Sequence, residues 1–301
     1  MTSQIQPAVV VGVDGSQHSL VALDLAADEA TRRREPLRII AAFLWPMFSL
    51  AAQVPGAAIT DDALDAAGRM LTDAADKIRG THPGLRVTTE VVIGSPGGVL
   101  VGESERASVV VVGNRGHGGF TSLLAGSVAT QLATHARCPV IVVRPGSTPA
   151  TATTRPVLVG VDGLERTEPA IEFAFEEAAS RGAALTAMHI WSEPPRPGSE
   201  PFKPVVYDYG EAEREADRLL AETLAGFQEK YPDVPVAREL IYGVDPAYHL
   251  RRASAEASLV VVGSQGRGEL SGLLLGSVGQ SLVHHAQCPV AIVRPGAAET
   301  H

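Results

Sequence analysis

The sequence repeats itself after about 150 residues. The glycine-rich stretch VVVVGNRGHGGFTSLLAGSV, residues 109–128, returns as VVVGSQGRGELSGLLLGSV, residues 260–278, with the same glycine spacing. Two further segments repeat in the same way: VVVGVDGS at 9–16 matches VLVGVDGL at 157–164, and CPVIVVRPG at 138–146 matches CPVAIVRPG at 288–296. A period of this length copies a whole domain, because the repeats of solenoids and propellers are far shorter.

The boundary between the two copies is predicted from a change in composition. The segment PGSTPATATTRP, residues 145–156, is rich in proline, threonine and serine and has no apolar periodicity, as is typical of an exposed linker. We therefore predict one domain over residues 1–146, a linker over 147–156 and a second domain over 157–301. The length of 301 residues agrees with two domains of about 150 residues each.

Each half alternates short β-branched runs with alanine-rich segments of helical period, which predicts parallel strands joined by crossover helices. The expected strands lie near 8–13, 37–44, 86–92, 108–112 and 139–143, and near 157–161, 185–191, 235–241, 258–262 and 289–293. The expected helices between them include Ser19–Arg33, Asp61–Arg79 and Tyr207–Lys230. The predicted fold class is α/β: two tandem, open, doubly wound parallel sheets of five strands, each with helices on both faces.

The composition excludes several classes of protein. No apolar run approaches the ~18 residues of a membrane-spanning helix, and the amino-terminal segment lacks the pattern of a secretory signal. A net charge of −9 argues against a broad surface for nucleic acid or acidic membrane. The two cysteines, Cys138 and Cys288, begin matching apolar strands, which indicates packing in a reduced compartment. We expect a soluble, cytoplasmic protein with no nucleic-acid or membrane partner.

The glycine-rich loops are the strongest functional signal. Gly113 and Gly116 follow a strand that is expected to be buried, and Gly126 and Ser127 open the next helix. Ligands of open parallel sheets bind beyond the carboxyl ends of the strands, and helix N-termini attract anions. The missing side chain at Gly116 indicates either close approach of a phosphate or a positive φ, and the Ser127 hydroxyl could cap the helix or bind phosphate. A plain glycine-rich turn is the alternative, but two copies of one spacing favour phosphate binding.

Two common phosphate-binding motifs are excluded. The P-loop requires a Gly-Lys pair, and none occurs in the sequence. The dinucleotide fingerprint G-x-G-x-x-G directly follows the first strand, where this sequence has Gly12-Val13-Asp14-Gly15.

The sequence instead resembles the universal stress protein family, whose ATP-binding members carry G-x-x-G, nine residues, then G-[ST]. Both copies match it: Gly113-Asn114-Arg115-Gly116 to Gly126-Ser127, and Gly263-Ser264-Gln265-Gly266 to Gly276-Ser277. The Val-Gly-Val-Asp ending of the first strand and the Cys-Pro-Val strand are also similar to the family, and the resemblance covers nearly all of the chain except the linker. It implies a Rossmann-like fold of the adenine nucleotide alpha hydrolase type, with ATP across the strand ends, adenine near the second strand and phosphates on the glycine loop.

The resemblance also implies which residues bind the nucleotide. Asp14 and Asp162 match the family's first-strand aspartate, expected near ribose or a phosphate-bound Mg²⁺, although an aspartate here could instead be a helix N-cap. Ala42 and Ile190 match the position whose backbone meets adenine. The full expected set is Gly12, Val13, Asp14, Ala42, Gly113, Asn114, Arg115, Gly116, Gly126, Ser127 and Val128 in the first half, and Gly160, Val161, Asp162, Ile190, Gly263, Ser264, Gln265, Gly266, Gly276, Ser277 and Val278 in the second.

The second copy departs from the first near the phosphates. Gln265 replaces Arg115, which removes a cation, and Glu269 stands where the first half has Gly119. Arg267, in place of His117, could compensate. Leu164 also replaces Ser16 after the Asp-Gly pair. We predict two ATP sites, the first-half site being the tighter.

The sequence favours a nucleotide-dependent regulator of stress response or growth. It contains no G-x-S-x-G elbow, and its histidines have no metal-ligand spacing; His284 and His285 are adjacent and so point to different faces of a helix. A slow ATPase and a nucleotide-free interaction protein remain the alternatives. The apolar last strands, Pro139–Val143 and Pro289–Val293, match the family's dimerisation edge. We expect the two halves to pair through them within one chain, and this unit to form a homodimer.

Overall fold

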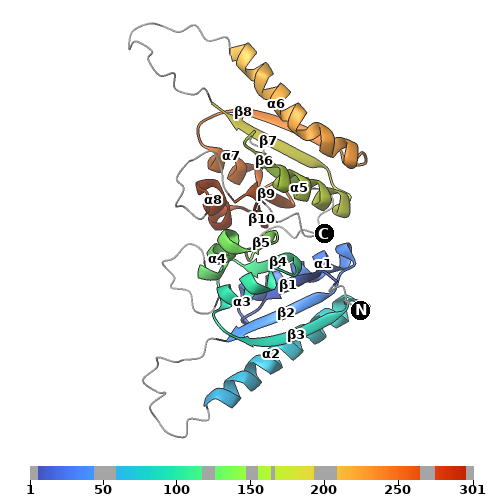
Figure 1. Cartoon of the computed structure of the whole chain (residues 1–301), viewed down its shortest axis with the longest axis vertical. Coiled ribbons are helices and arrows are strands. Elements are labelled where there is room, and N and C mark those ends of the chain that lie inside the picture. The colour runs from blue at the N-terminus through green and yellow to red at the C-terminus, as the bar shows by residue number, and fades with distance from the viewer. Residues whose placement is uncertain are drawn as a thin grey trace, which may run out of the picture.

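The computed structural model describes residues 6–43, 59–116, 126–146, 155–163, 167–192, 209–264 and 275–295. The first half contains β1 (Ala8–Gly12), α1 (Gln17–Arg33), β2 (Leu37–Phe43), α2 (Ile59–Thr81), β3 (Val87–Ile93), α3 (Pro96–Glu103), β4 (Ala107–Gly113), α4 (Ser127–His135) and β5 (Val140–Val143). The second half contains β6 (Val157–Val161), α5 (Glu168–Arg181), β7 (Leu185–Trp191), α6 (Tyr209–Lys230), β8 (Val236–Tyr242), α7 (Pro246–Ala253), β9 (Leu259–Gly263), α8 (Ser277–His285) and β10 (Val290–Val293). The α/β fold class predicted from the sequence is confirmed in both halves (Figure 1).

Capping residues shift some helix boundaries from their expected positions. The first helix begins at Gln17, two residues before the expected Ser19, because Ser16 is its N-cap and its hydroxyl accepts a hydrogen bond from Ser19 N at 3.2 Å. The helix ends where Arg34 adopts a left-handed conformation, with φ of 56°. Gly182, with φ of 60°, ends the corresponding helix α5.

The strands form a single ten-stranded sheet in the order β3-β2-β1-β4-β5-β10-β9-β6-β7-β8. Neighbouring strands within each half are parallel, whereas β5 and β10 pair antiparallel, with Ile141 opposite Ala291. All four residues of each of these two strands are buried. The apolar edge strands of the two halves thus cover one another within the chain.

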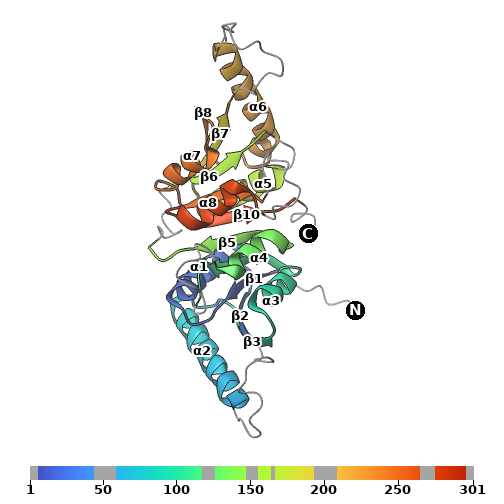
Figure 2. The ribbon, with the colours of Figure 1, turned by 90° about the vertical axis from the view of Figure 1, so that its left-hand side faces the viewer.

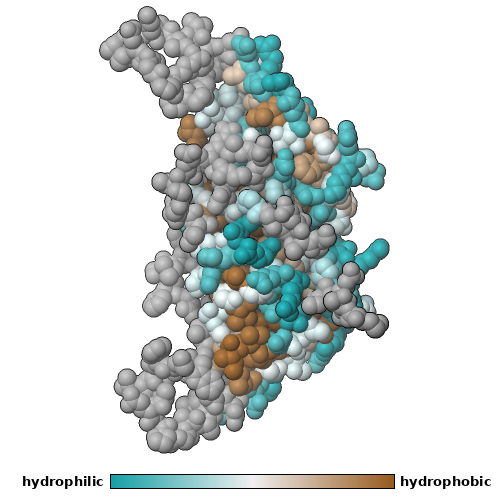
Figure 3. Space-filling view, in the orientation of Figure 1, coloured by the Kyte–Doolittle hydropathy of each residue, from teal (hydrophilic) through white to brown (hydrophobic). Residues whose placement is uncertain are grey.

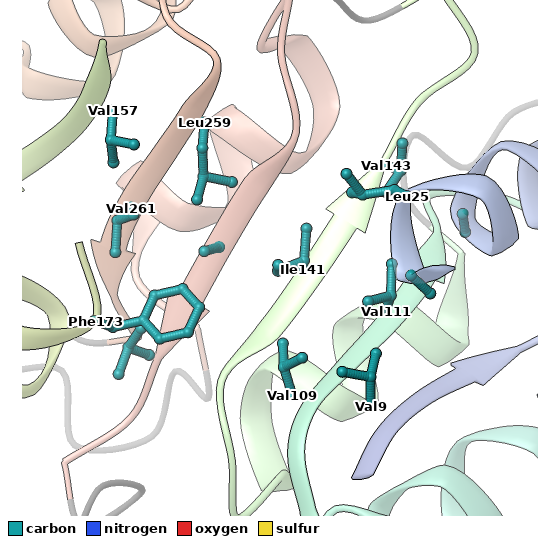
Figure 4. Close-up of a cluster of buried hydrophobic side chains, with 14 of the residues drawn as sticks. Val9, Leu25, Val109, Val111, Ile141, Val143, Val157, Phe173, Leu259 and Val261 are labelled. Atoms are coloured by element: carbon teal, nitrogen blue, oxygen red, sulfur yellow. The ribbon is translucent and has the colours of Figure 1, made fainter. Parts of the chain in front are cut away.

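Helices cover both faces of this sheet (Figures 1 and 2). Side chains of α1, α2, α5 and α6 pack on one face, and those of α3, α4, α7 and α8 pack on the other. Figure 4 shows that the first of these clusters continues across the junction, from Val111 over Ile141 to Phe173. The two halves therefore share a core.

The surface is mixed in polarity. In Figure 3, hydrophilic and weakly polar residues cover much of the visible face, and an apolar patch lies over its lower half. In the ranges that the structure describes, no helix is both long and apolar enough to cross a membrane.

A buried ion cluster joins α1 to α5 at the junction. Arg181 Nη2 of α5 lies 2.5 Å from Glu29 Oε1 of α1. In the reciprocal ion pair, Arg33 of α1 contacts Glu177 of α5. Both carboxylates are almost completely buried. Burial alone would raise the pKa of Glu29, but Arg181, Arg32 and Arg33 hold this pKa below its usual value. Burial lowers the pKa of Arg181 to about 10 despite the neighbouring Glu29.

A second reciprocal contact lies at the ends of α4 and α8. The Arg144 guanidinium donates a hydrogen bond to the carbonyl of Ala286 at 3.0 Å, and the Arg294 guanidinium donates one to the carbonyl of Ala136 at 3.2 Å. Ala136 and Ala286 are the C-caps of these helices, so each cation lies at a helix end that carries partial negative charge.

We predict that Arg181→Met lowers the free energy of unfolding by about 3 kcal/mol, because it leaves buried carboxylates with fewer cations. We expect the full effect at neutral pH. Because the pKa of Glu29 is lower in the folded protein than its unfolded value near 4.5, its ion pairing stabilises the fold at pH values above 4.5. This stabilisation is lost as the pH falls through the folded pKa. Urea unfolding at pH 7 measures the change.

The control variant is Arg218→Met, which removes an ion pair with Glu215 whose two side chains are both 64% exposed. Solvent screens such a pair, and we expect no measurable change. Equal unfolding midpoints for the two variants would contradict a structural role for the buried cluster.

Candidate functional site

The predicted site lies where the strand order reverses in each half. Strands β1 and β4 are neighbours in the sheet, but β1 leads to β2 on one side and β4 leads to β5 on the other. The carboxyl ends of two such strands form the usual ligand crevice of an open parallel sheet. Strands β6 and β9 have the same relation in the second half.

The structure brings Asp14 and Gly116 together at this crevice. Both residues are exposed, and a Cβ placed on Gly116 would lie 2.4 Å from Asp14 Oδ2. The other carboxylate oxygen, Oδ1, accepts a hydrogen bond from Ser16 N at 3.0 Å. One carboxylate therefore lies directly beside the glycine loop, although it is 102 positions away in the sequence.

The alternative in which the aspartates are helix N-caps is wrong. Ser16 is the N-cap of α1 and Thr167 is the N-cap of α5. Asp162 accepts a hydrogen bond from the Thr167 hydroxyl, so this aspartate orients the residue that begins the helix. The tight turns after both aspartates depend on the next residue, because Gly15 and Gly163 have φ of 81° and 77°.

Several of the predicted site glycines are explained by packing within the protein. A Cβ on Gly113 would lie 2.8 Å from the backbone of His18, and one on Gly12 would lie 2.6 Å from Leu100. Gly160 has the corresponding relation to Leu250, at 3.0 Å. Gly116 is different: its nearest neighbour is the movable end of Asp14, and its φ is not positive, so the positive-φ interpretation of this glycine is wrong.

Asn114 joins the two ends of the first glycine loop, and its side chain does not point into solvent. Its side chain is buried, and its Oδ1 lies 2.6 Å from Nδ1 of His18. Its backbone N donates to Val143 O at 2.8 Å, and its carbonyl accepts from Gly126 N at 2.9 Å. Ser264 makes the same two backbone contacts in the second half, with Val293 and Gly276, and is also buried.

The starts of α4 and α8 offer amide groups to a ligand. Gly126 and Gly276 are the N-caps, so Ser127 and Ser277 are the first helical residues and the interpretation of Ser127 as the cap is wrong. Both serines are exposed, and the first-turn amides, which include those of Val128 and Val278, have no partner within a helix. A phosphate group fits such a position.

The residues expected near adenine lie at the ends of their strands. Ala42 is half-buried next to the last residue of β2, and Ile190 is buried next to the last residue of β7. Val13, which directly follows β1, and Val161, the last residue of β6, are both buried. The carbonyl of Val161 accepts a hydrogen bond from buried His189 at 2.7 Å, a contact that the sequence did not predict.

Part of each glycine loop lies outside the described residues. Arg115 is exposed beside Gly116, and Gly263 ends β9. Gln265 and Gly266 lie outside the described residues, as do His117, Gly119, Leu164, Arg267 and Glu269. The predicted differences between the two phosphate loops therefore stay predictions.

The two cysteines lie away from this crevice. Cys138 and Cys288 are buried and free, and burial raises the pKa of each thiol to about 12. These thiols stay protonated at neutral pH, which agrees with a packing role.

Comparison with known proteins gives the same picture in both halves. Residues 7–144 and 153–294 each match the model of the Universal stress protein family. A universal stress protein of Mycolicibacterium smegmatis is 39% identical over 298 residues, which cover 97% of this chain and 99% of the relative. One of Mycobacterium tuberculosis is 38% identical over 298 residues, covering 96% and 97%.

Among solved structures, a universal stress protein from Archaeoglobus fulgidus aligns with a TM-score of 0.71 at 21% identity. The alignment covers 96% of this chain and 98% of that protein. This likeness supports the fold.

We predict that Gly113→Ala and Gly116→Ala differ in their effect on stability. The new Cβ at 113 would meet the backbone of α1, which cannot move alone, so we expect a loss of about 1–3 kcal/mol. The new Cβ at 116 would meet only a side-chain oxygen of Asp14, which can rotate away. Thermal unfolding of the two variants tests this, and a Gly116→Ala protein that was the less stable of the two would contradict it.

Proposed function

The chain belongs to the universal stress protein family, and on that premise we propose that it is an ATP-binding regulator with one ATP site in each half. The sites lie in the proposed domains 1–146 and 157–301. The observation that carries the proposal is the meeting of Asp14 with Gly116 beside the open first turn of α4.

The phosphates would lie on the glycine loop. The amides of Ser127 and Val128 present partial positive charge, and Arg115 adds a full one. Asp14 would then face either a ribose hydroxyl or a Mg²⁺ ion held through the phosphates, because a carboxylate beside phosphates needs a hydroxyl or cation partner. The adenine would lie against the strand ends at Ala42, and at Ile190 in the second half.

The first-half site is proposed to be the tighter. Arg115 has Gln265 as its counterpart, and Ser264, with a shorter side chain, stands in place of the Asn114 that contacts His18. A loop that is already fixed loses less conformational freedom when it binds a ligand.

A regulator fits these contacts better than an enzyme. Backbone amides and a carboxylate beside a glycine loop bind and orient phosphates, but fast phosphoryl transfer also requires a positioned nucleophile and transition-state cations. A slow ATPase is the second candidate, favoured by the position of Asp14. ATP turnover that disappears in Asp14→Asn while binding persists would support the enzyme. A nucleotide-free interaction protein is the third candidate, and it would bind no ATP.

We also propose that the protein acts in the cytoplasm and that the paired halves form a homodimer. The homodimer is proposed from the family resemblance alone, because the last strands β5 and β10 already pair with each other within the chain. The target of the regulation and the stress concerned are left open.

Calorimetric titration of nucleotide-stripped protein with ATP tests the proposal. We expect two ATP per chain in the parent and one in either Gly116→Ala or Gly266→Ala, with at least about a tenfold loss of affinity at the altered site, equal to about 1.4 kcal/mol. Gly116→Ala acts by moving the Asp14 carboxylate and by blocking the approach of phosphate.

The double variant Gly116→Ala/Gly266→Ala is expected to bind no ATP. The matched control is Gly80→Ala, since Gly80 lies in α2 with nothing within 4 Å of an added Cβ. If the double variant bound two ATP with parental affinity, the glycine loops would be turns only.

A further inference from the structure

A groove in the second half lies between the outer strands of the sheet and α7. Its floor consists of Leu158, near the start of β6, Met188, in the middle of β7, and Ile241, next to the last residue of β8. The carboxyl-terminal part of α7 forms one wall. The volume is about 340 Å³, which lies within the range of small-molecule sites. One end of the groove is at Ile241, which lies opposite Ile190, the residue predicted to meet adenine, and the other end is at Pro156 and Thr186, by the starts of β6 and β7.

The equivalent position in the first half is filled by the protein itself. Arg38 of β2 lies there, with Nη2 2.9 Å from Glu90 Oε2 of β3 and with Nε donating to Glu103 Oε2 of α3 at 3.2 Å. The space that remains is about 100 Å³. The first half thus shows that this place accommodates a guanidinium group on an alkyl stem, held by carboxylates from a strand and a helix.

Two differences open the groove in the second half. Thr186 occupies the second position of β7, as Arg38 does in β2, and Ala253 is the last residue of α7, as Glu103 is of α3. The carboxylate on the outer strand is kept, since Glu239 lies opposite Met188 as Glu90 lies opposite Ile40. The second half therefore lacks the arginine that fills this position in the first half, but it has the carboxylate of Glu239 in the place of Glu90.

The charges around the groove favour a cation. Glu239 and Glu256 border it and are exposed, and neither forms an ion pair within the part of the chain that the structure describes. The basic groups that border it are Arg252, which is also exposed, and His249, which is half-buried. Arg252 forms no ion pair with either glutamate.

We propose that this groove binds a small organic cation, a guanidinium group on a short alkyl stem. The guanidinium group pairs with Glu239, as the Arg38 guanidinium pairs with Glu90 in the first half, and the stem lies on Leu158, Met188 and Ile241. Arg252 stands at the rim and opposes the ligand charge.

An NMR titration of the full-length ¹⁵N-labelled protein with n-butylguanidinium tests the proposal. We expect saturable shifts of the amides of Thr186 and Ala253, and no such shifts at Arg38 and Glu103, which serve as the internal control. Neutral n-butylurea has the same shape and is expected to bind at least about fivefold more weakly, the effect of one partly exposed ion pair.

Three variants complete the test. Thr186→Arg/Ala253→Glu rebuilds the arrangement of the first half and should abolish binding, whereas Glu239→Gln keeps the shape of the groove and should weaken binding about fivefold. Arg252→Ala should not weaken binding. If the double variant fails to fold, Glu239→Gln and n-butylurea still decide the matter. The proposal is overturned if saturating n-butylguanidinium shifts neither amide, if n-butylurea binds equally well, or if Glu239→Gln binds like the parent.

Discussion

The antiparallel pairing of β5 with β10 is the interaction on which the rest of the structure depends. Each half ends in a four-residue strand whose residues are all buried and whose outer edge pairs with the other half. An isolated half would expose this strand as an unpaired apolar edge, which invites association with other chains. Pairing within one chain removes that edge and produces one continuous sheet.

The same pairing explains why the contacts at the junction come in reciprocal sets. Glu29 with Arg181 repeats as Glu177 with Arg33, and the Arg144 contact with one helix end repeats as the Arg294 contact with the other. A duplicated domain that pairs with its own copy uses each surface residue twice, as in a symmetric dimer. The tandem chain has the interface of a homodimer within one polypeptide.

The fold could be predicted from the sequence, and the site only in part. Short runs rich in β-branched residues, repeated after 150 residues, predicted the ten strands, because the inner strands are continuous apolar runs and the outer strands β3 and β8 follow from the repeat. The meeting of Asp14 with the glycine loop was implied by family resemblance. Glu29 and Arg33 stand four positions apart on α1, as Glu177 and Arg181 do on α5, and such a spacing usually indicates a solvated helix face. The buried pairing of Glu29 with Arg181 could therefore not be predicted. The role of Gly113 was also missed, since only the fold shows that α1 packs against it.

The two halves are alike in fold but differ in detail at the places that would bind ligands. His18 contacts Asn114 in the first half, where the second half has Ser264, and His189 contacts Val161 in the second half, where the first half has Ala41. Arg38 fills a position that Thr186 leaves open. The central claim, that both crevices hold an adenine nucleotide, is tested most directly by mass spectrometry of small molecules released from the purified, denatured protein. We predict ATP at up to two molecules per chain. Release of no nucleotide from protein that was purified without stripping and then incubated with excess ATP would contradict it.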